Sequence, residues 1–337
     1  MTEIANWNSE VDVNKKCSLL IGLIVSFVCT IVGGKFVQGA EKPVKVRAGY
    51  VSPTTDNVIM VIAQKQGFLN KRGIEVEIIA LRGATQVAQA LLSNSLQFAE
   101  MSGPVVVRST LSGGDLVMVA SFVDRISYYL ISRPEINNVK DLVGKKIAAS
   151  SIGGSVDMVL RLGLKDLGID PKSVTLLPAG PPESRMAALT SGQMAATALL
   201  PEHLVAVDKA GLKILKDLSE VDVRIQHTGL VVRRSLIKEN RPLVKNFLAA
   251  IVEAVDFYRA HERESIEILA KFTGIKDPKA LKDSYEFHKK LFPQPPYPNR
   301  DGFRTVLAEI GDKGADGKSV TPEMFFDRTV LEELKEK

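Results

Sequence analysis

Apolar segments and polar loops alternate along the chain in an order that occurs twice. In the first copy, residues 45–50 are predicted to form a strand and residues 52–57 a polar loop that leads into an apolar helix. In the second copy, about a hundred residues later, residues 146–149 predict a strand and residues 150–155 a loop before the next helix. Each copy is expected to leave hydroxyl groups and free backbone N–H groups at a helix N-terminus, which suits an anion or another hydrogen-bond acceptor.

Strands and helices are predicted to alternate through both halves. Residues 74–79 show the period of two that is typical of a half-buried strand, and residues 116–122 are a continuous apolar run typical of a buried one. Residues 174–177 and 194–199 are predicted strands of the second half. This order implies mostly parallel sheets with right-handed crossovers, flanked by helices. In such sheets ligands bind beyond the carboxyl ends of the strands.

Two segments are predicted to connect the halves. Residues 128–132 lead toward the second half, and residues 225–232 form a return strand to the first. Because two crossings make a hinge, the fold class is predicted to be α/β with two lobes. The first lobe comprises residues 41–123 and 228–337, and the second comprises residues 124–227. After the return strand, apolar residues at helical spacing predict C-terminal helices that complete the first lobe.

Residues 1–40 have the pattern of a targeting segment. Two lysines precede an apolar run, residues 18–32, and small residues follow it. A basic start, an apolar centre and small residues before a cleavage zone are typical of a secretory signal peptide, which predicts export. The alternative is an uncleaved membrane anchor through residues 17–34.

The composition excludes several kinds of chemistry. Both cysteines, Cys17 and Cys29, lie in the targeting segment, so the chain without it has no disulfide framework, thiolate metal site or cysteine nucleophile. The patterns GxGxxG, GxxxxGK(S/T), GxSxG and HExxH are absent, and no cofactor, metal site or catalytic residue is predicted. The net charge of +5 is spread along the 337 residues without a basic run interleaved with aromatic residues, so nucleic acid is not an expected partner.

Loops after the predicted strands supply the candidate ligand contacts. Paired glycines in the second half allow a ligand to approach the backbone closely. Thr55 or Asp56 can instead be a plain helix N-cap, and the loop after residues 96–99 can be a plain turn, so structural roles remain as alternatives. The candidates from these loops are Ser52, Thr54, Thr55, Asp56, Ser102, Gly103, Gly153, Gly154 and Ser155.

Charged and titratable side chains near the same loops complete the set. Arg82 and Arg185 are candidate counter-charges for an anionic group, although Arg185 can equally be a surface residue. Glu202 and His203 follow a predicted strand and are expected at the floor of the cleft, and His227 lies at the hinge. For both histidines a structural role is the favoured alternative, because a lone histidine seldom assembles a site.

Several short runs carry a resemblance to a known family. They are AQKQGFL at residues 63–69, SNSLQFA at residues 93–99, VKDLVGKKIA at residues 139–148, RMAALTSG at residues 185–192 and PYP at residues 296–298. In this order, behind a targeting segment, they resemble the periplasmic solute-binding proteins of bacterial ABC importers of the nitrate, sulfonate, taurine and bicarbonate type. That group is related to the thiamine-pyrimidine synthase superfamily.

The resemblance implies a fold, a function and partners. The fold would be the type II-like periplasmic-binding-protein fold with two hinge crossings. The chain would be the substrate-binding component of an importer, and would not be an enzyme. It would capture a small, anionic or zwitterionic organic solute between its lobes and deliver it to an ABC transporter membrane permease, as a monomer in the periplasm.

Two alternatives use the same fold. One is an enzyme of pyrimidine or thiamine-precursor metabolism, for which the resemblance implies an active-site histidine and a cysteine cluster. The chain without its targeting segment has no cysteine, which disfavours this alternative. The other is a sensory ligand-binding domain tethered to the membrane by the N-terminal segment.

Overall fold

The computed structural model describes residues 42–81, 83–314 and 316–335. The predicted targeting segment, residues 1–40, and Arg82 lie outside the described residues. From Pro43 to Lys337 the chain forms one compact unit. Within the described ranges, no helix is both long enough and apolar enough to cross a membrane.

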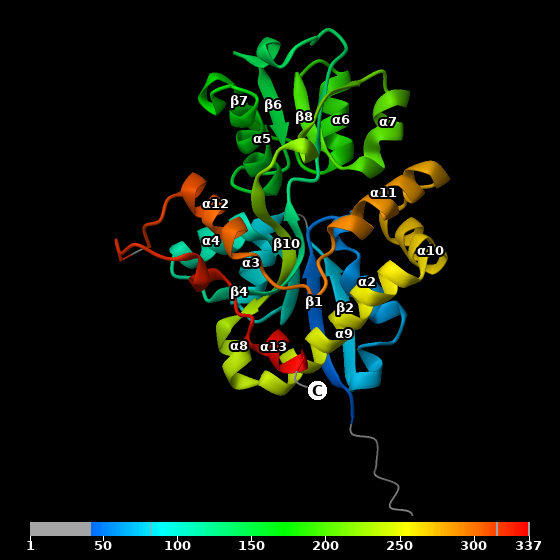
Figure 1. Ribbon diagram of the computed structural model, residues 1–337, viewed down its shortest axis with the longest axis vertical. Coiled ribbons are helices and arrows are strands. Elements are labelled where there is room, and N and C mark those ends of the chain that lie inside the picture. The colour runs from blue at the N-terminus through cyan, green and yellow to red at the C-terminus, as the bar shows by residue number, and fades with distance from the viewer. Residues whose placement is uncertain (1–41, 82, 315, 336–337) are drawn as a thin grey trace, which may run out of the picture. The chain divides into compact units, whose positions relative to one another are not determined.

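The first sheet has five strands in the order β2-β1-β3-β10-β4 (Figure 1). β1 is parallel to β2 and β3, whereas β10 is antiparallel to both β3 and β4. Four strands therefore share one direction and β10 alone opposes them. The strand bounds are Val44–Tyr50 for β1, Ile74–Ala80 for β2, Phe98–Ser102 for β3, Leu116–Arg125 for β4 and Arg224–Arg233 for β10.

The second sheet repeats this arrangement in the order β7-β6-β8-β5-β9. β6 is parallel to β7 and β8, and β5 is antiparallel to both β8 and β9, so one strand again opposes four. The prediction of mostly parallel strands is confirmed in both sheets, but β9 was not predicted. The bounds are Tyr129–Ser132 for β5, Lys146–Ala149 for β6, Thr175–Pro178 for β7, Ala196–Leu199 for β8 and Lys213–Asp217 for β9.

The chain passes between the two sheets twice. β4 of the first sheet leads into β5 of the second, and the return runs from β9 into β10, between β3 and β4 (Figure 1). The predicted α/β fold with two lobes and two crossings is confirmed. We call the body around the first sheet the first lobe and the body around the second sheet the second lobe. The predicted boundaries at residues 123–124 and 227–228 fall inside β4 and β10 and stay a prediction.

Helices cover both faces of the first sheet. Alternate side chains of β3 point to opposite faces: Phe98 shares a core with α2 and α9, and Met101 shares a core with α3, α4 and α12. The Phe98 ring stacks on Phe247 of α9 at 3.7 Å between centroids. The α-helices are Ile59–Lys65 (α2), Ala84–Leu92 (α3), Gly103–Leu111 (α4), Ser155–Asp166 (α5), Pro182–Thr190 (α6), Leu204–Lys209 (α7), Arg234–Glu239 (α8), Arg241–Ala260 (α9), Glu262–Thr273 (α10), Pro278–Leu291 (α11), Arg300–Ile310 (α12) and Thr329–Lys335 (α13).

One apolar core joins the two lobes. It contains Val106 of α4 from the first lobe together with Val159 of α5 from the second, so the lobes pack against each other. Short 3-10 helices connect many of the elements. They are Thr55–Asn57 (η1), Asn70–Arg72 (η2), Val139–Leu142 (η3), Pro171–Ser173 (η4), Pro201–His203 (η5), Leu218–Glu220 (η6) and Pro322–Phe325 (η7).

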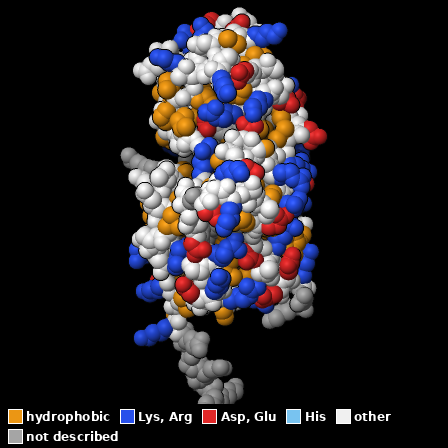
Figure 2. Space-filling view, turned by 90° about the vertical axis from the view of Figure 1, so that its left-hand side faces the viewer, with side chains coloured by type: hydrophobic (Ala, Val, Ile, Leu, Met, Phe, Trp, Pro, Cys, Tyr) orange, Lys and Arg blue, Asp and Glu red, His pale blue; other side chains and the backbone are white. Residues whose placement is uncertain are grey.

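Charges of both signs are interspersed on the surface. Among the described side chains on the face in Figure 2, neither the Lys and Arg nor the Asp and Glu side chains gather into one continuous patch. This agrees with a net charge that is small for the length of the chain.

The contact of α12 with the return strand depends on a glycine. A Cβ added at Gly302 would lie 2.5 Å from the backbone N of Gln226 in β10, and neither backbone can yield easily. We expect Gly302→Ala to lower the free energy of unfolding by about 1–3 kcal/mol, the range for overpacking in a core. Urea unfolding measures this, with Gly314→Ala as the control because its Cβ would lie 3.2 Å from its nearest neighbour, the end of the Asp316 side chain. Equal stability of the two variants would contradict the close packing.

Candidate functional site

A cavity of about 680 Å³, lined by both polar and apolar groups, lies between the two lobes. This volume is within the usual range for small-molecule sites, about 300–1,000 Å³. Both lobes contribute to its wall, and the first-lobe residues follow β1 and β2 or belong to β3. The first lobe supplies Val51, Ser52, Thr54, Asp56, Asn57, Gly83, Ala84, Glu100, Met101 and Ser102, and the second supplies Ser150, Ser151, Gly154, Ser155, Val156, Gly180, Pro181, Pro182, Ser184, Arg185, Leu200 and His203, with Tyr128 and Thr228 between them.

The structure brings most of the predicted site residues together in this cavity. The predicted residues that line it are Ser52, Thr54, Asp56, Ser102, Gly154, Ser155, Arg185 and His203. The predicted residues that do not line it are Thr55, Gly103, Gly153, Glu202 and His227.

The first-lobe wall differs from the prediction in one important way. The first loop was expected to open directly into a helix with free N–H groups, and this expectation is wrong. The short η1 helix follows the loop, and α2 begins only at Ile59. The N–H of Met60 donates to Glu100 Oε1 at 2.9 Å, so a buried carboxyl group caps α2 in place of a ligand.

Glu100 is a cavity residue that the sequence analysis missed. Its side chain is 0% exposed, and while Oε1 accepts the Met60 N–H, Oε2 has no hydrogen-bond partner. Burial raises the pKa of the Glu100 carboxyl well above its ordinary value; the Met60 N–H opposes this rise, and nearby Asp56 adds to it. A glutamate in the middle of the otherwise apolar strand segment 98–101 was the signal that could have revealed it.

A chain of polar contacts runs from Asp56 to the hinge. Asp56 Oδ2 lies 3.4 Å from His227 Nδ1, and His227 Nε2 lies 3.1 Å from the Tyr128 hydroxyl. Burial lowers the pKa of His227, and the Asp56 carboxylate opposes this effect. Burial also raises the pKa of Tyr128, so its hydroxyl stays protonated. His227 therefore stands behind the cavity wall and supports two residues that line it.

The second-lobe wall is electropositive. α5 begins at Ser155, and its N-cap residue Gly154 has no side chain to cap the helix, so the first-turn N–H groups remain available at the cavity. Arg185 is buried and donates from Nη1 to Thr197 Oγ1 at 3.0 Å, while its Nε has no partner. Burial lowers the pKa of Arg185 to about 10, so the guanidinium remains charged at neutral pH.

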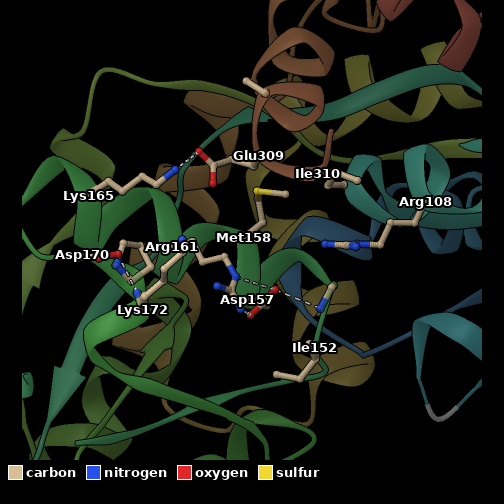
Figure 3. Close-up of a pocket in the computed structure, with 13 residues that line it drawn as sticks. Arg108, Ile152, Asp157, Met158, Arg161, Lys165, Asp170, Lys172, Glu309 and Ile310 are labelled. Atoms are coloured by element: carbon tan, nitrogen blue, oxygen red, sulfur yellow. Dashed lines mark hydrogen bonds and ion pairs between the residues drawn. The ribbon is translucent and has the colours of Figure 1, made fainter. Parts of the chain in front are cut away.

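Gly153 belongs to a different cavity, which we call the side cavity and which has a volume of about 540 Å³ (Figure 3). The Gly153 N–H donates to Asp157 Oδ2 at 3.1 Å and is not free for a ligand in the main cavity. Arg108 reaches from α4 toward this position, and Asp157 pairs with Arg161 at 3.0 Å (Figure 3). The positive φ of Gly153 and its contact with Arg108 explain why glycine is present there.

Glu202 links the lobes from the end of β8. Its Oε1 accepts the Thr55 N–H at 3.0 Å and its Oε2 accepts the Ser284 hydroxyl at 3.1 Å, both from the first lobe. Burial raises the pKa of Glu202, but His288, His203 and the Thr55 N–H more than offset this and hold it below its ordinary value. Glu202, predicted at the floor of the cleft, thus forms a buried polar bridge, and Thr55 takes part in the same bridge.

Two α/β lobes joined by two crossings, with a cavity between them, define the class of periplasmic binding proteins. Residues 54–265 match the family described as NMT1/THI5 like. The match covers more than half of the chain, and the chain belongs to this family. The resemblance inferred from the sequence is thereby confirmed.

Individual relatives agree with this assignment. The chain is 28% identical over 242 residues to a Brucella abortus protein provisionally named as a binding protein, covering 69% of this chain and 72% of that one. It is 27% identical over 307 residues to an Escherichia coli protein provisionally named as an aliphatic sulfonates-binding protein, covering 88% of each chain. The periplasmic nitrate-binding protein of Synechocystis has a similar fold, with a TM-score of 0.70, 16% identity, and coverage of 88% and 89%.

Removing the Glu202 carboxyl should destabilise the protein. We expect Glu202→Ala to lower the free energy of unfolding by about 2–3 kcal/mol, because the buried Thr55 N–H and Ser284 hydroxyl lose their acceptor. Glu202→Gln retains one acceptor oxygen and should cost less. Urea unfolding is the measurement, and Glu77→Ala on the exposed face of β2 is the control. A Glu202→Ala protein as stable as the control would show that the bridge contributes nothing.

His227 should make stability depend on pH. Its pKa is lowered in the folded protein from 6.5, so unfolding takes up a proton, and stability present above about pH 6.5 is lost as the pH falls. One such group contributes a slope of up to about 1.4 kcal/mol per pH unit. Unfolding free energies measured between pH 7.5 and pH 5 should fall less steeply for His227→Gln, whereas exposed His261→Gln should follow the wild type. Parallel curves for His227→Gln and wild type would refute this role.

Proposed function

We propose that this protein is the substrate-binding component of an ABC-type importer. It captures a small organic solute in the cavity between its lobes and delivers it to a membrane permease. The observation that carries the proposal is the cavity itself, because both lobes supply polar groups to its wall. Lobes joined by only two crossings can open and close around such a volume by hinge motion.

The chemistry of the wall favours a solute with an anionic group. The start of α5 offers backbone N–H groups beside the Ser155 hydroxyl, and Arg185 supplies a buried positive charge. The names of two relatives, for aliphatic sulfonates and for nitrate, are consistent with this preference. An anionic or zwitterionic organic solute is therefore the proposed cargo, and the ligand contacts are the predicted residues that line the cavity.

The proposal includes location and assembly. The pattern of residues 1–40 supports export to the periplasm, the location given in the name of the Synechocystis nitrate-binding protein. Removal of this segment would release the protein, and its retention would tether it through residues 17–34. We assign the chain no reaction, no nucleic-acid partner and a monomeric state.

A panel of solutes tests the proposed function. Thermal unfolding would be measured with nitrate, bicarbonate, taurine, alkyl and aryl sulfonates, pyrimidines and aromatic carboxylates. A solute at 100 times its dissociation constant stabilises the folded state by about 2.7 kcal/mol, which raises the midpoint by a few degrees for a chain of this length. We expect a dose-dependent shift for one chemical class.

Two arginine variants identify where the solute binds. Arg185→Gln removes the positive charge that Arg185 places at the main cavity and should weaken binding about tenfold or more. Arg108→Gln makes the same change in the side cavity and should leave binding unchanged. No shift with any solute would contradict the binding function, and loss of binding only in Arg108→Gln would move the site to the side cavity.

A further inference from the structure

The formal charges that line the main cavity are divided by lobe. Among the described residues, the acids Asp56 and Glu100 come from the first lobe, and the cation Arg185 comes from the second. His203 also lines the second-lobe side, but burial lowers its pKa, so its ring is neutral near pH 7. The cavity therefore has an acidic side and a basic side.

A structural role accounts for only one of the two carboxyl oxygens of Glu100. Capping the Met60 N–H of α2 requires one acceptor oxygen, which a glutamine would also provide. The second oxygen, Oε2, is buried, belongs to a residue that lines the cavity, and has no hydrogen-bond partner. Buried polar atoms in native proteins are nearly always paired, so an unpaired carboxyl oxygen at a binding cavity calls for a ligand group.

The surroundings of Glu100 define the charge of that group. Asp56 lies close enough to raise the pKa of Glu100, and no described Lys or Arg forms an ion pair with either carboxyl. The basic side chain beside Asp56 is His227, 3.4 Å away, and burial lowers the pKa of its ring. Two neighbouring acids in a buried site repel each other unless a cation lies between or beside them. A positively charged ligand group would satisfy Oε2, return Glu100 to its ionised form and neutralise this repulsion.

We propose that Glu100, together with Asp56, selects solutes that carry a protonated amine or amidinium group. The anionic group of the same solute lies at the opposite side, against the first turn of α5 and Arg185. The preferred cargo is thus a zwitterion with separated charges, of the aminosulfonate or amino-carboxylate type. This inference rests on the proposed function and narrows the class of solute.

Isosteric pairs of probes test the requirement for the cation. Taurine and propanesulfonate differ only in an ammonium group replaced by a methyl group. Cyclohexylaminopropanesulfonate and cyclohexylbutanesulfonate form a larger pair, in which a methylene group replaces the charged NH₂⁺, and they suit the volume of the cavity. Titration calorimetry on the wild-type protein should show that at least one amine binds about tenfold or more tightly than its isostere.

Two variants assign the preference to Glu100. Glu100→Gln keeps the shape and an acceptor for Met60, so it should fold and lose the preference for the amine over the isostere that lacks it. Glu77→Gln makes the same substitution at an exposed position of β2 and should keep the preference.

The outcomes distinguish the role of Glu100 in selecting the solute from the proposed importer function. Equal affinity within both pairs, or a preference that survives in Glu100→Gln, would overturn the role of Glu100. A solute without a cationic group that binds best in the wider panel would also overturn it, while the importer function would stand. Failure of every solute to bind would instead refute the proposed function.

Discussion

The buried bridge from Glu202 is the interaction on which the site depends. A carboxylate at the end of β8 in the second lobe accepts hydrogen bonds from Thr55 and Ser284 in the first. Because a buried charge is tolerated only with such partners, the bridge fixes where the two lobes meet. The loop that carries Thr55 also carries Thr54 and Asp56, so the same contact places the first-lobe wall of the cavity.

The two lobes have similar topology, but they supply cavity walls with different charge. In the second lobe, the helix that follows the first parallel strand presents uncapped N–H groups to the cavity. In the first lobe, the equivalent helix is capped by Glu100, and the loop before it presents Asp56 instead. A repeated strand–loop–helix unit has thus become a basic wall on one side and an acidic wall on the other. This asymmetry gives a captured molecule one preferred orientation.

Sequence patterns predicted the architecture better than the site. The two copies of the strand–loop–helix unit, the return strand and the apolar face of α9 are local periodicities, and each is present, although the short η1 helix separates the first loop from α2. Glu100 and Glu202 were missed or misplaced because their roles depend on contacts with residues 40 and 147 positions away. Such partners come together only through the order of strands in the sheets. Gly153 was misjudged because its N–H is taken by Asp157, in the first turn of the helix that follows it.

The central claim is that one solute binds between the lobes with its charges oriented by the two walls. The most direct test is a crystal structure of the protein with the solute that binds best. Our account predicts that the solute lies in the main cavity, with its anionic group near Ser155 and Arg185 and its cationic group near Asp56 and Glu100. A solute found in the side cavity beside Arg108, or with its charges reversed, would contradict the account.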